Sequence, residues 1–162
     1  MNVLLTAFQG TSAERLIRQF DSRYDKIILC NNKPQSVEQL TRALALREYR
    51  FIISFGQKPV IRDKVCIELC ARLDGTVRQT TFPVSRLAEA LTASEIPIKI
   101  SHNAGTSFCN HLYACGLRHL AQNSGNTEMV FLHIPFQKNI SDFDSFSQKL
   151  QTAANQCLLT EL

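Results

Sequence analysis

Short apolar segments of β type alternate with segments of helical spacing along almost the whole chain. The strand-like runs are residues 2–8, 26–30, 50–55, 96–100 and 129–133, and the helical patterns are residues 11–20, 37–47, 85–93, 106–121 and 143–159. The strand-like runs are too continuously apolar to be half exposed, which is typical of strands covered on both faces. Parallel strands also need a crossover, which is usually a helix. The alternation therefore predicts an α/β fold, a three-layer α/β/α sandwich around a mostly parallel sheet.

One region departs from this alternation. Residues 65–72 and 76–82 both have β character and flank the dipeptide Asp74-Gly75, which favours a tight turn with positive φ. They predict a short antiparallel hairpin near residues 65–82.

The length and charge of the chain limit what it can be. It has 162 residues without a repeat, linker or low-complexity segment, so we expect a single domain over residues 1–162. Lys and Arg total 18 and Asp and Glu 14, a net charge of +4 that is spread along the chain. This is far weaker than the charge of a typical nucleic-acid binder, so we expect no nucleic-acid partner.

The apolar runs are too short for a membrane protein. None approaches the roughly 20 residues that cross a bilayer, and the start MNVLLTAFQG lacks the basic region of a secretory signal. We therefore expect no membrane partner and a cytoplasmic location, and the sequence leaves a homo-oligomer open.

Six cysteines lie scattered or inside apolar patterns, and without a secretion signal we expect most of them to be reduced core residues. They are Cys30, Cys66, Cys70, Cys109, Cys115 and Cys157. His111, Cys115 and His119 share one helical stripe, but a single stripe cannot close a tetrahedral zinc site. Gly10 alone is too little for a phosphate loop. We expect neither a metal nor an organic cofactor.

Cys109 lies where a strand is followed by the start of a helix, in the segment SHNAGTSFCN. Unpaired N–H groups and the helix dipole favour a thiolate in the first turn, so we expect a lowered pKa for this thiol. The same N–H groups could hold an oxyanion. The commoner alternative is that a cysteine at this position is a core residue.

Two residues are candidate partners of such a nucleophile. His133 ends a predicted strand, and Glu68 is the one charged residue in the apolar run VCIELCA. An imidazole can take the thiol proton, and a carboxylate can orient the imidazole. The alternatives are a histidine bonded locally in a loop and a glutamate solvated on the outer face of a hairpin.

The expected sheet also locates a ligand site. In α/β sheets ligands bind beyond the carboxyl ends of the strands. Four loops are therefore candidate walls of a site: residues 8–11, 55–58, 101–106 and 133–136.

Three strings in the sequence resemble motifs of the cysteine-type pyroglutamyl peptidases: AGTSFCNHLY, FLHIP and the run IELCA. The resemblance implies that Cys109 is the nucleophile, His133 the base and Glu68 the third member of a catalytic triad. The segments LLTAF and ISFGQ are similar to the substrate loops of that family. On this resemblance we expect substrate contacts from Phe8, Gln57 and Phe108, and stabilisation of the oxyanion by Arg62.

The chain also departs from the family pattern. The second half of the Phe-rich loop is absent, Leu69 stands where the family has Lys or Arg, and the interval from Glu68 to Cys109 is short. The resemblance implies a cysteine peptidase that removes an N-terminal pyroglutamyl or related blocked residue from a small peptide or lactam-bearing substrate. The alternative is a non-catalytic relative that acts as a small-ligand or protein-binding module.

Overall fold

The computed structural model describes residues 2–123 and 125–159, so a few positions of the expected domain 1–162 lie outside it. Six strands form the main sheet: β1 (Val3–Phe8), β2 (Asp25–Leu29), β3 (Phe51–Lys58), β4 (Val65–Glu68), β7 (Ile98–Ser101) and β8 (Glu128–Pro135). A second sheet contains β5 (Cys70–Leu73) and β6 (Thr76–Gln79). The helices are α1 (Ser12–Gln19), α2 (Lys33–Leu46), α3 (Val84–Ala93), α4 (Phe108–Gln122), α5 (Phe143–Leu159) and the short 3-10 helix η1 (Gln137–Asn139).

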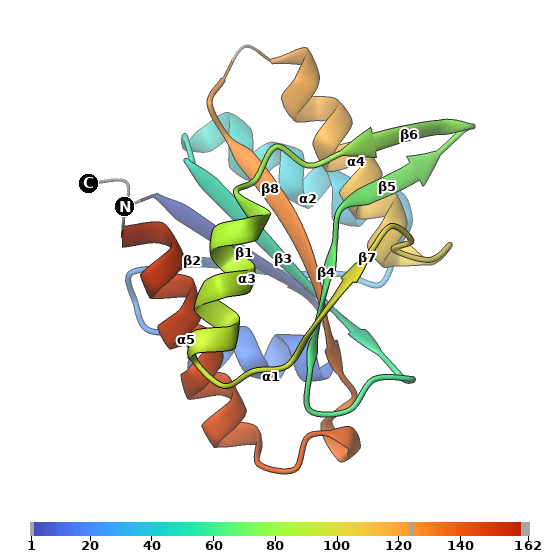
Figure 1. Ribbon diagram of the computed structural model, residues 1–162. Coiled ribbons are helices and arrows are strands. Elements are labelled where there is room, and N and C mark those ends of the chain that lie inside the picture. The colour runs from blue at the N-terminus through green and yellow to red at the C-terminus, as the bar shows by residue number, and fades with distance from the viewer. Residues whose placement is uncertain (1, 124, 160–162) are drawn as a thin grey trace.

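The main sheet is mixed but mostly parallel. Its strand order is β2-β1-β3-β8-β4-β7, and the first four strands of this order run parallel to one another. β4 is antiparallel to β8, and β7 is parallel to β4 (Figure 1). The strands of this sheet are buried or nearly so, except at its edges.

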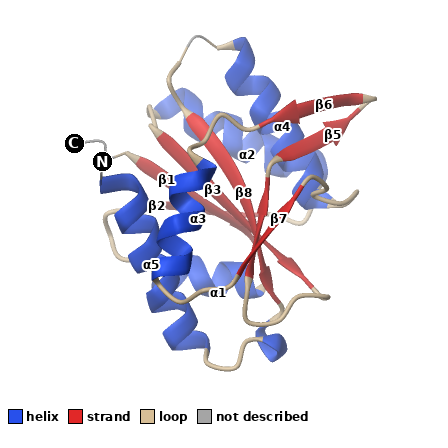
Figure 2. Ribbon diagram, viewed as in Figure 1, coloured by secondary structure: helices blue, strands red, loops and turns tan. Residues whose placement is uncertain are grey.

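Helices cover both faces of the main sheet (Figure 2). One core joins side chains of α1, α3 and α5 to the sheet, and a second joins side chains of α2 and α4 to the other face. The three-layer α/β/α sandwich predicted from the sequence is confirmed.

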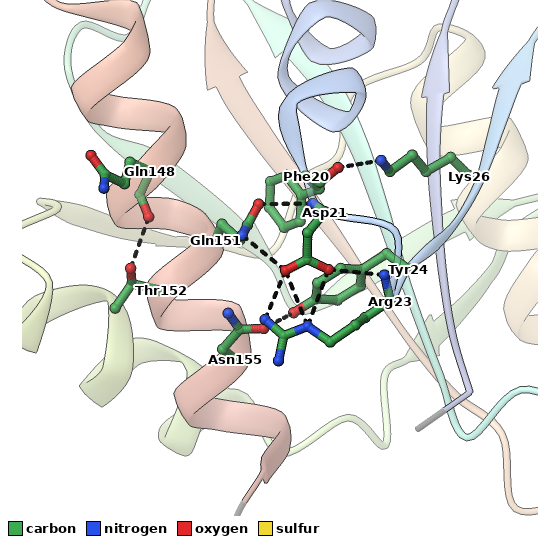
Figure 3. Close-up of polar contacts among 9 residues, drawn as sticks. All are labelled: Phe20, Asp21, Arg23, Tyr24, Lys26, Gln148, Gln151, Thr152 and Asn155. Atoms are coloured by element: carbon green, nitrogen blue, oxygen red, sulfur yellow. Dashed lines mark hydrogen bonds and ion pairs between the residues drawn. The ribbon is translucent and has the colours of Figure 1, made fainter.

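Polar contacts hold α5 against the turn that follows α1 (Figure 3). Tyr24 donates its hydroxyl to Asn155 Oδ1 at 2.5 Å. Gln151 accepts from the backbone N–H of Asp21 and donates to its carboxylate, both at 3.1 Å. These bonds tie α5 to the segment between α1 and β2.

The helix starts follow local capping chemistry. Thr11 caps α1, because its hydroxyl accepts from the backbone N–H of Glu14. The second helix was expected from residue 37 but begins four residues earlier. Asn32 caps it by accepting from Gln35 N, and Pro34 occupies the first turn.

The expected strand over residues 65–72 is two strands. β4 joins the main sheet, and only β5 pairs with β6 to form the hairpin around Asp74-Gly75. The chain changes sheets at Leu69, whose N–H donates to Ser101 O and whose carbonyl accepts from Thr80 N. The hairpin prediction is thus confirmed for β5 and β6, and wrong for residues 65–68. Figure 1 shows the β5–β6 ribbon projecting from the body beside α4.

All six cysteines are free thiols, and five of them are buried. Across the described residues, no helix is both long and apolar enough to span a bilayer.

Candidate active site

Three neighbouring strands present their functional side chains on one face of the sheet, beneath α4. In the register, Gly56 of β3 lies beside His133 of β8, and Cys66 of β4 lies on the other side of the same histidine. Side chains two residues apart share a face, so Lys58 and Glu68 lie on this face too. The sheet therefore brings groups from three strands around His133.

The centre of the site is a buried pair of Glu68 and His133. His133 Nδ1 lies 2.7 Å from Glu68 Oε1, and both side chains are almost inaccessible to solvent. Burial alone would raise the pKa of Glu68, but hydrogen bonding by His133, the Ser101 hydroxyl and Lys58 outweighs it and holds the pKa at about 2. The carboxylate is therefore ionised at neutral pH, and Nδ1 carries the proton that it accepts. The two candidate partners that the sequence singled out, Glu68 and His133, are thus in direct contact. The alternative of a solvated Glu68 is wrong, because its side chain is fully buried.

Glu68 Oε1 has two further neighbours. Lys58 Nζ lies 3.0 Å away and forms an ion pair, and Cys66 Sγ donates a weak hydrogen bond at 3.4 Å. The other carboxylate oxygen, Oε2, is buried and has no hydrogen-bond partner among the described residues. Lys58 and Cys66 thus contact the same carboxylate oxygen that faces His133.

Cys109 lies in the first turn of α4, as predicted, and Ser107 is the N-cap residue. Its Sγ lies over Gly56: a Cβ added at Gly56 would be 2.6 Å from this sulfur. The strand expected over residues 50–55 instead continues to Lys58, and the missing side chain of Gly56 makes room for the thiol. Because Gly56 is the register neighbour of His133, the sulfur lies next to the histidine's strand.

The electrostatics of the thiol differ from the expectation. Burial raises the pKa of Cys109 to about 11, and Glu68 adds to this, against the lowering effects of the Ser107 hydroxyl and the backbone N–H of Cys109. The expected lowering of this pKa by the helix N-terminus is wrong for the free protein, because desolvation outweighs it. A thiolate at neutral pH therefore requires a base that removes the proton directly.

A small cavity of about 180 Å³ opens beside Cys109. Phe8 and Phe108 form part of its wall, with ring centroids 5.9 Å apart and planes tilted by 47°. Its lining residues are Phe8, Thr11, Asn31, Gly56, Gln57, Ser107, Phe108, Cys109 and Phe136. The structure thus gathers all three residues expected to contact substrate in one cavity with the candidate nucleophile.

Three of the four expected loops reach this cavity, through residues 8–11, 55–58 and 133–136. Residues 101–106 are not among its lining residues, so that expectation is wrong. The reason is the direction of β7. It runs opposite to β8, so its carboxyl end points away from the end of the sheet at which β8 finishes. The wall that it was expected to supply comes from Ser107 and Phe108.

Relatives of known type resemble this chain in sequence. A family model described as pyroglutamyl peptidase matches residues 59–155, more than half of the chain. The chain belongs to the pyroglutamyl peptidase family. The match includes all three residues that the sequence assigned to a triad, Glu68, Cys109 and His133.

Individual members of the pyroglutamyl peptidase family are similar over different lengths. A pyrrolidone-carboxylate peptidase of Vibrio vulnificus is 33% identical over 130 residues, 74% of this chain and 56% of its own length. One from Alkaliphilus oremlandii is 37% identical over 55 residues, 34% of this chain and 26% of its own. The chain thus spans between about a quarter and just over half of these curated relatives.

Solved structures show the same fold. A mutant pyrrolidone carboxyl peptidase from Pyrococcus furiosus superposes with a TM-score of 0.85, covering 100% of both chains at 19% identity. The pyroglutamyl peptidase I of Bacillus amyloliquefaciens gives 0.82 at 21% identity, covering 96% of this chain and 95% of its own. The trimmed region between β4 and α4 therefore leaves the pyroglutamyl peptidase fold intact.

Two side chains hold α4, and with it Cys109, in place, and both were missed by the sequence analysis. Asn110 bonds both ways to the backbone of Arg72 in β5, accepting at 2.9 Å and donating at 2.7 Å. Tyr113 donates its hydroxyl to Glu68 O at 3.0 Å. The hairpin and β4 are thus both tied to the helix that carries the thiol.

Gln57 also has a structural contact. Its Oε1 accepts from the backbone N–H of Ser12 at 3.0 Å and lies 3.2 Å from the Ser12 hydroxyl. The amide thereby joins β3 to the start of α1.

The structure does not bring Arg62 to this site. It is exposed in the loop after β3, and the described residues that line the cavity do not include it. No group of three His, Cys, Asp or Glu side chains is placed to hold a metal ion in the part of the chain that the structure describes. On the helical stripe considered for zinc, His111 Nε2 lies 3.8 Å from Cys115 Sγ.

Proposed function

We propose that this chain is a cysteine peptidase that removes an N-terminal pyroglutamyl residue, with Cys109 as nucleophile, His133 as base and acid, and Glu68 as the residue that orients His133. The observation that carries the proposal is the position of Cys109 Sγ over Gly56, beside a histidine whose Nδ1 is bound to a buried carboxylate. Membership of the pyroglutamyl peptidase family supports it.

The first half of the reaction forms an acyl-enzyme. Nδ1 of His133 is occupied by Glu68, so Nε2 is the nitrogen that takes the Cys109 proton. The thiolate then attacks the carbonyl carbon of the pyroglutamyl residue. The C–N bond breaks as the imidazolium returns its proton to the departing amine. The buried Glu68 carboxylate stabilises the imidazolium that forms between these steps.

The second half releases the pyroglutamate. His133 removes a proton from water, the resulting hydroxide attacks the thioester, and the thiol leaves with that proton. The first-turn N–H groups of α4 have no partner inside the helix, so they are the donors that we assign to the oxyanion in both halves. Apart from the substrate and water, every step uses groups of the chain itself.

The cavity supports a small cyclic acyl group. Phe8 and Phe108 offer apolar ring faces, and Gln57 Nε2 can donate to a lactam carbonyl. We therefore assign these three residues to substrate binding, with a small peptide or another lactam-bearing compound as the substrate class. Arg62, expected to stabilise the oxyanion, gains no support from its exposed position.

Two broader features complete the proposal. The free thiols support a reducing compartment, so we place the protein in the cytoplasm. We also infer that residues 1–162 act as one domain, since one sheet joins strands from both halves of the chain.

Hydrolysis of a fluorogenic pyroglutamyl amide tests the proposal. The wild-type chain should release the fluorophore, Cys109→Ser should abolish release without unfolding the protein, and Cys115→Ser should retain it. The serine control is matched, because Cys115 lies in the same helix and is also buried. A folded wild-type chain that releases nothing, or equal loss in both variants, would favour the non-catalytic binding module instead.

A further inference from the structure

We propose that Lys58 is a positioning residue of this site. Its side chain crosses over β8 and pairs with the Glu68 carboxylate, which orients His133, so Lys58 holds this carboxylate in place and offsets part of its negative charge. The role in catalysis rests on the proposed function. The contact between Lys58 and Glu68 is observed in the structure whatever the function is.

The sheet order forces the crossing. β3, which carries Lys58, and β4, which carries Glu68, lie on opposite sides of β8. Neighbouring strands lie about 4.8 Å apart, so the backbones of β3 and β4 are about 10 Å apart. The ends of the two side chains nevertheless lie 3.0 Å apart. They must therefore meet above β8, on the face where His133 lies.

Lys58 reaches the same carboxylate oxygen that His133 uses. Both contacts are to Glu68 Oε1, at 3.0 Å for Lys58 Nζ and 2.7 Å for His133 Nδ1. A carboxylate with two cationic or polar donors on one oxygen has little freedom to rotate away from the imidazole. The ammonium group also cancels part of the negative charge that Glu68 places beside His133 and Cys109.

Each element packed around the carboxylate contributes a defined group. β3 supplies Lys58 and β4 supplies Cys66, β8 supplies His133, β7 supplies the Ser101 hydroxyl, and α4 supplies Cys109. Among these groups Lys58 is the ammonium side chain, and it forms an ion pair with Glu68. It lowers the pKa of Cys109 and that of Cys66, whereas Glu68 raises both, after the larger effect of burial.

Removing this cation should raise the pKa of every neighbouring group, because each proton becomes harder to lose without the positive charge nearby. Lys58 Nζ lies within about 6 Å of His133 Nδ1, since both contact one oxygen. A charge about 6 Å from a titrating group shifts its pKa by about one unit for an effective dielectric constant near 40, and we take this as the scale for the Cys109 thiol, on which Lys58 also acts. Because the Lys58 side chain is 27% exposed, solvent screening reduces this to about half to one pH unit.

Alkylation of Cys109 by iodoacetamide, followed from pH 6 to 12 by mass mapping so that the range includes its pKa of about 11, tests the proposal. The reagent is neutral, so the lysine cannot attract it electrostatically. In Lys58→Met the midpoint should move to higher pH by about half to one unit, which slows alkylation about three- to tenfold at a pH below the midpoint. Lys58→Arg should restore the wild-type midpoint, and Lys138→Met, which removes an exposed charge, should leave it unchanged.

The variants separate this role from simple neutralisation of a buried charge. If Lys58→Met does not fold, Lys58→Gln provides an uncharged donor of similar length, and the same shift is expected. A midpoint that coincides with wild type in the folded variant overturns the proposal, as does a shift that arginine fails to reverse. The assay needs no substrate. A wild-type chain with rapid, His133-dependent alkylation but no pyroglutamyl hydrolysis would refute the proposed function alone.

Discussion

Gly56→Ala tests whether the missing side chain of β3 is what admits the nucleophile. The added carbon would lie 2.6 Å from Cys109 Sγ and 2.9 Å from the Phe131 ring, where ordinary contacts are 3.4–4 Å. Gly56 does not have a positive φ, so alanine is acceptable to the backbone and only space opposes it. The sulfur must therefore retreat by about 1 Å, and a displacement of that size can reduce turnover about 100-fold. Overpacking should also cost about 1–3 kcal/mol of unfolding free energy.

Gly116→Ala is the matched control for this change. Its added carbon would lie equally close, 2.6 Å, to Met129 Sδ in the same core. A methionine side chain can move aside, and the substitution improves helix propensity, so activity should remain near wild type.

The assay for both variants is hydrolysis of a pyroglutamyl amide together with urea unfolding. We expect the loss of turnover only in Gly56→Ala, beyond what its change in stability explains. Wild-type turnover in a folded Gly56→Ala variant would refute the placement of Cys109 over this glycine.

Two further predictions concern the ionised carboxylate and the cavity. The pKa of Glu68 is depressed in the folded state, so the ionised carboxylate stabilises the fold above about pH 4.5, and this stabilisation is lost as the pH falls toward 2. Urea unfolding should show that the free energy of unfolding falls between pH 7 and pH 3 by on the order of 2 kcal/mol more in the wild type than in Glu68→Gln. An equal pH dependence in both proteins would contradict this. Phe8→Ala should raise KM for a pyroglutamyl amide about tenfold with little change in kcat, because it removes one apolar wall of the cavity but no group that moves a proton; an unchanged KM would remove Phe8 from the substrate site.

Much of the fold followed from local patterns. Helix α1 was predictable because Thr11 and Glu14 form a capping pattern, and β8 because its apolar run is continuous. The division of residues 65–72 into β4 and β5 was not, since a strand-like run does not reveal which neighbour each half will pair with. That choice depends on Ser101 and Thr80, which are distant in sequence and bond to Leu69 on either side.

Some contacts of the site could be predicted from the sequence and others could not. The approach of Glu68 to His133 could be anticipated, because a lone carboxylate in an apolar strand needs a partner. Lys58 could not, because no spacing rule links it to a carboxylate two strands away in the sheet. The raised pKa of Cys109 was also beyond the sequence, since the burial that causes it comes from the position of the thiol over Gly56 in the second core.

The central claim is that His133 and Cys109 act as one unit, and limiting alkylation near neutral pH tests it most directly. Each cysteine of the native protein is labelled with iodoacetamide at pH 7 and mapped by mass, in wild type and in His133→Ala. Burial raises the pKa of Cys109 to about 11, so rapid labelling requires a base beside it. We predict that Cys109 reacts faster than Cys115 and Cys157 and slows at least tenfold in His133→Ala. Labelling of Cys109 that is no faster than theirs, or that is unaffected by the loss of His133, would contradict the account.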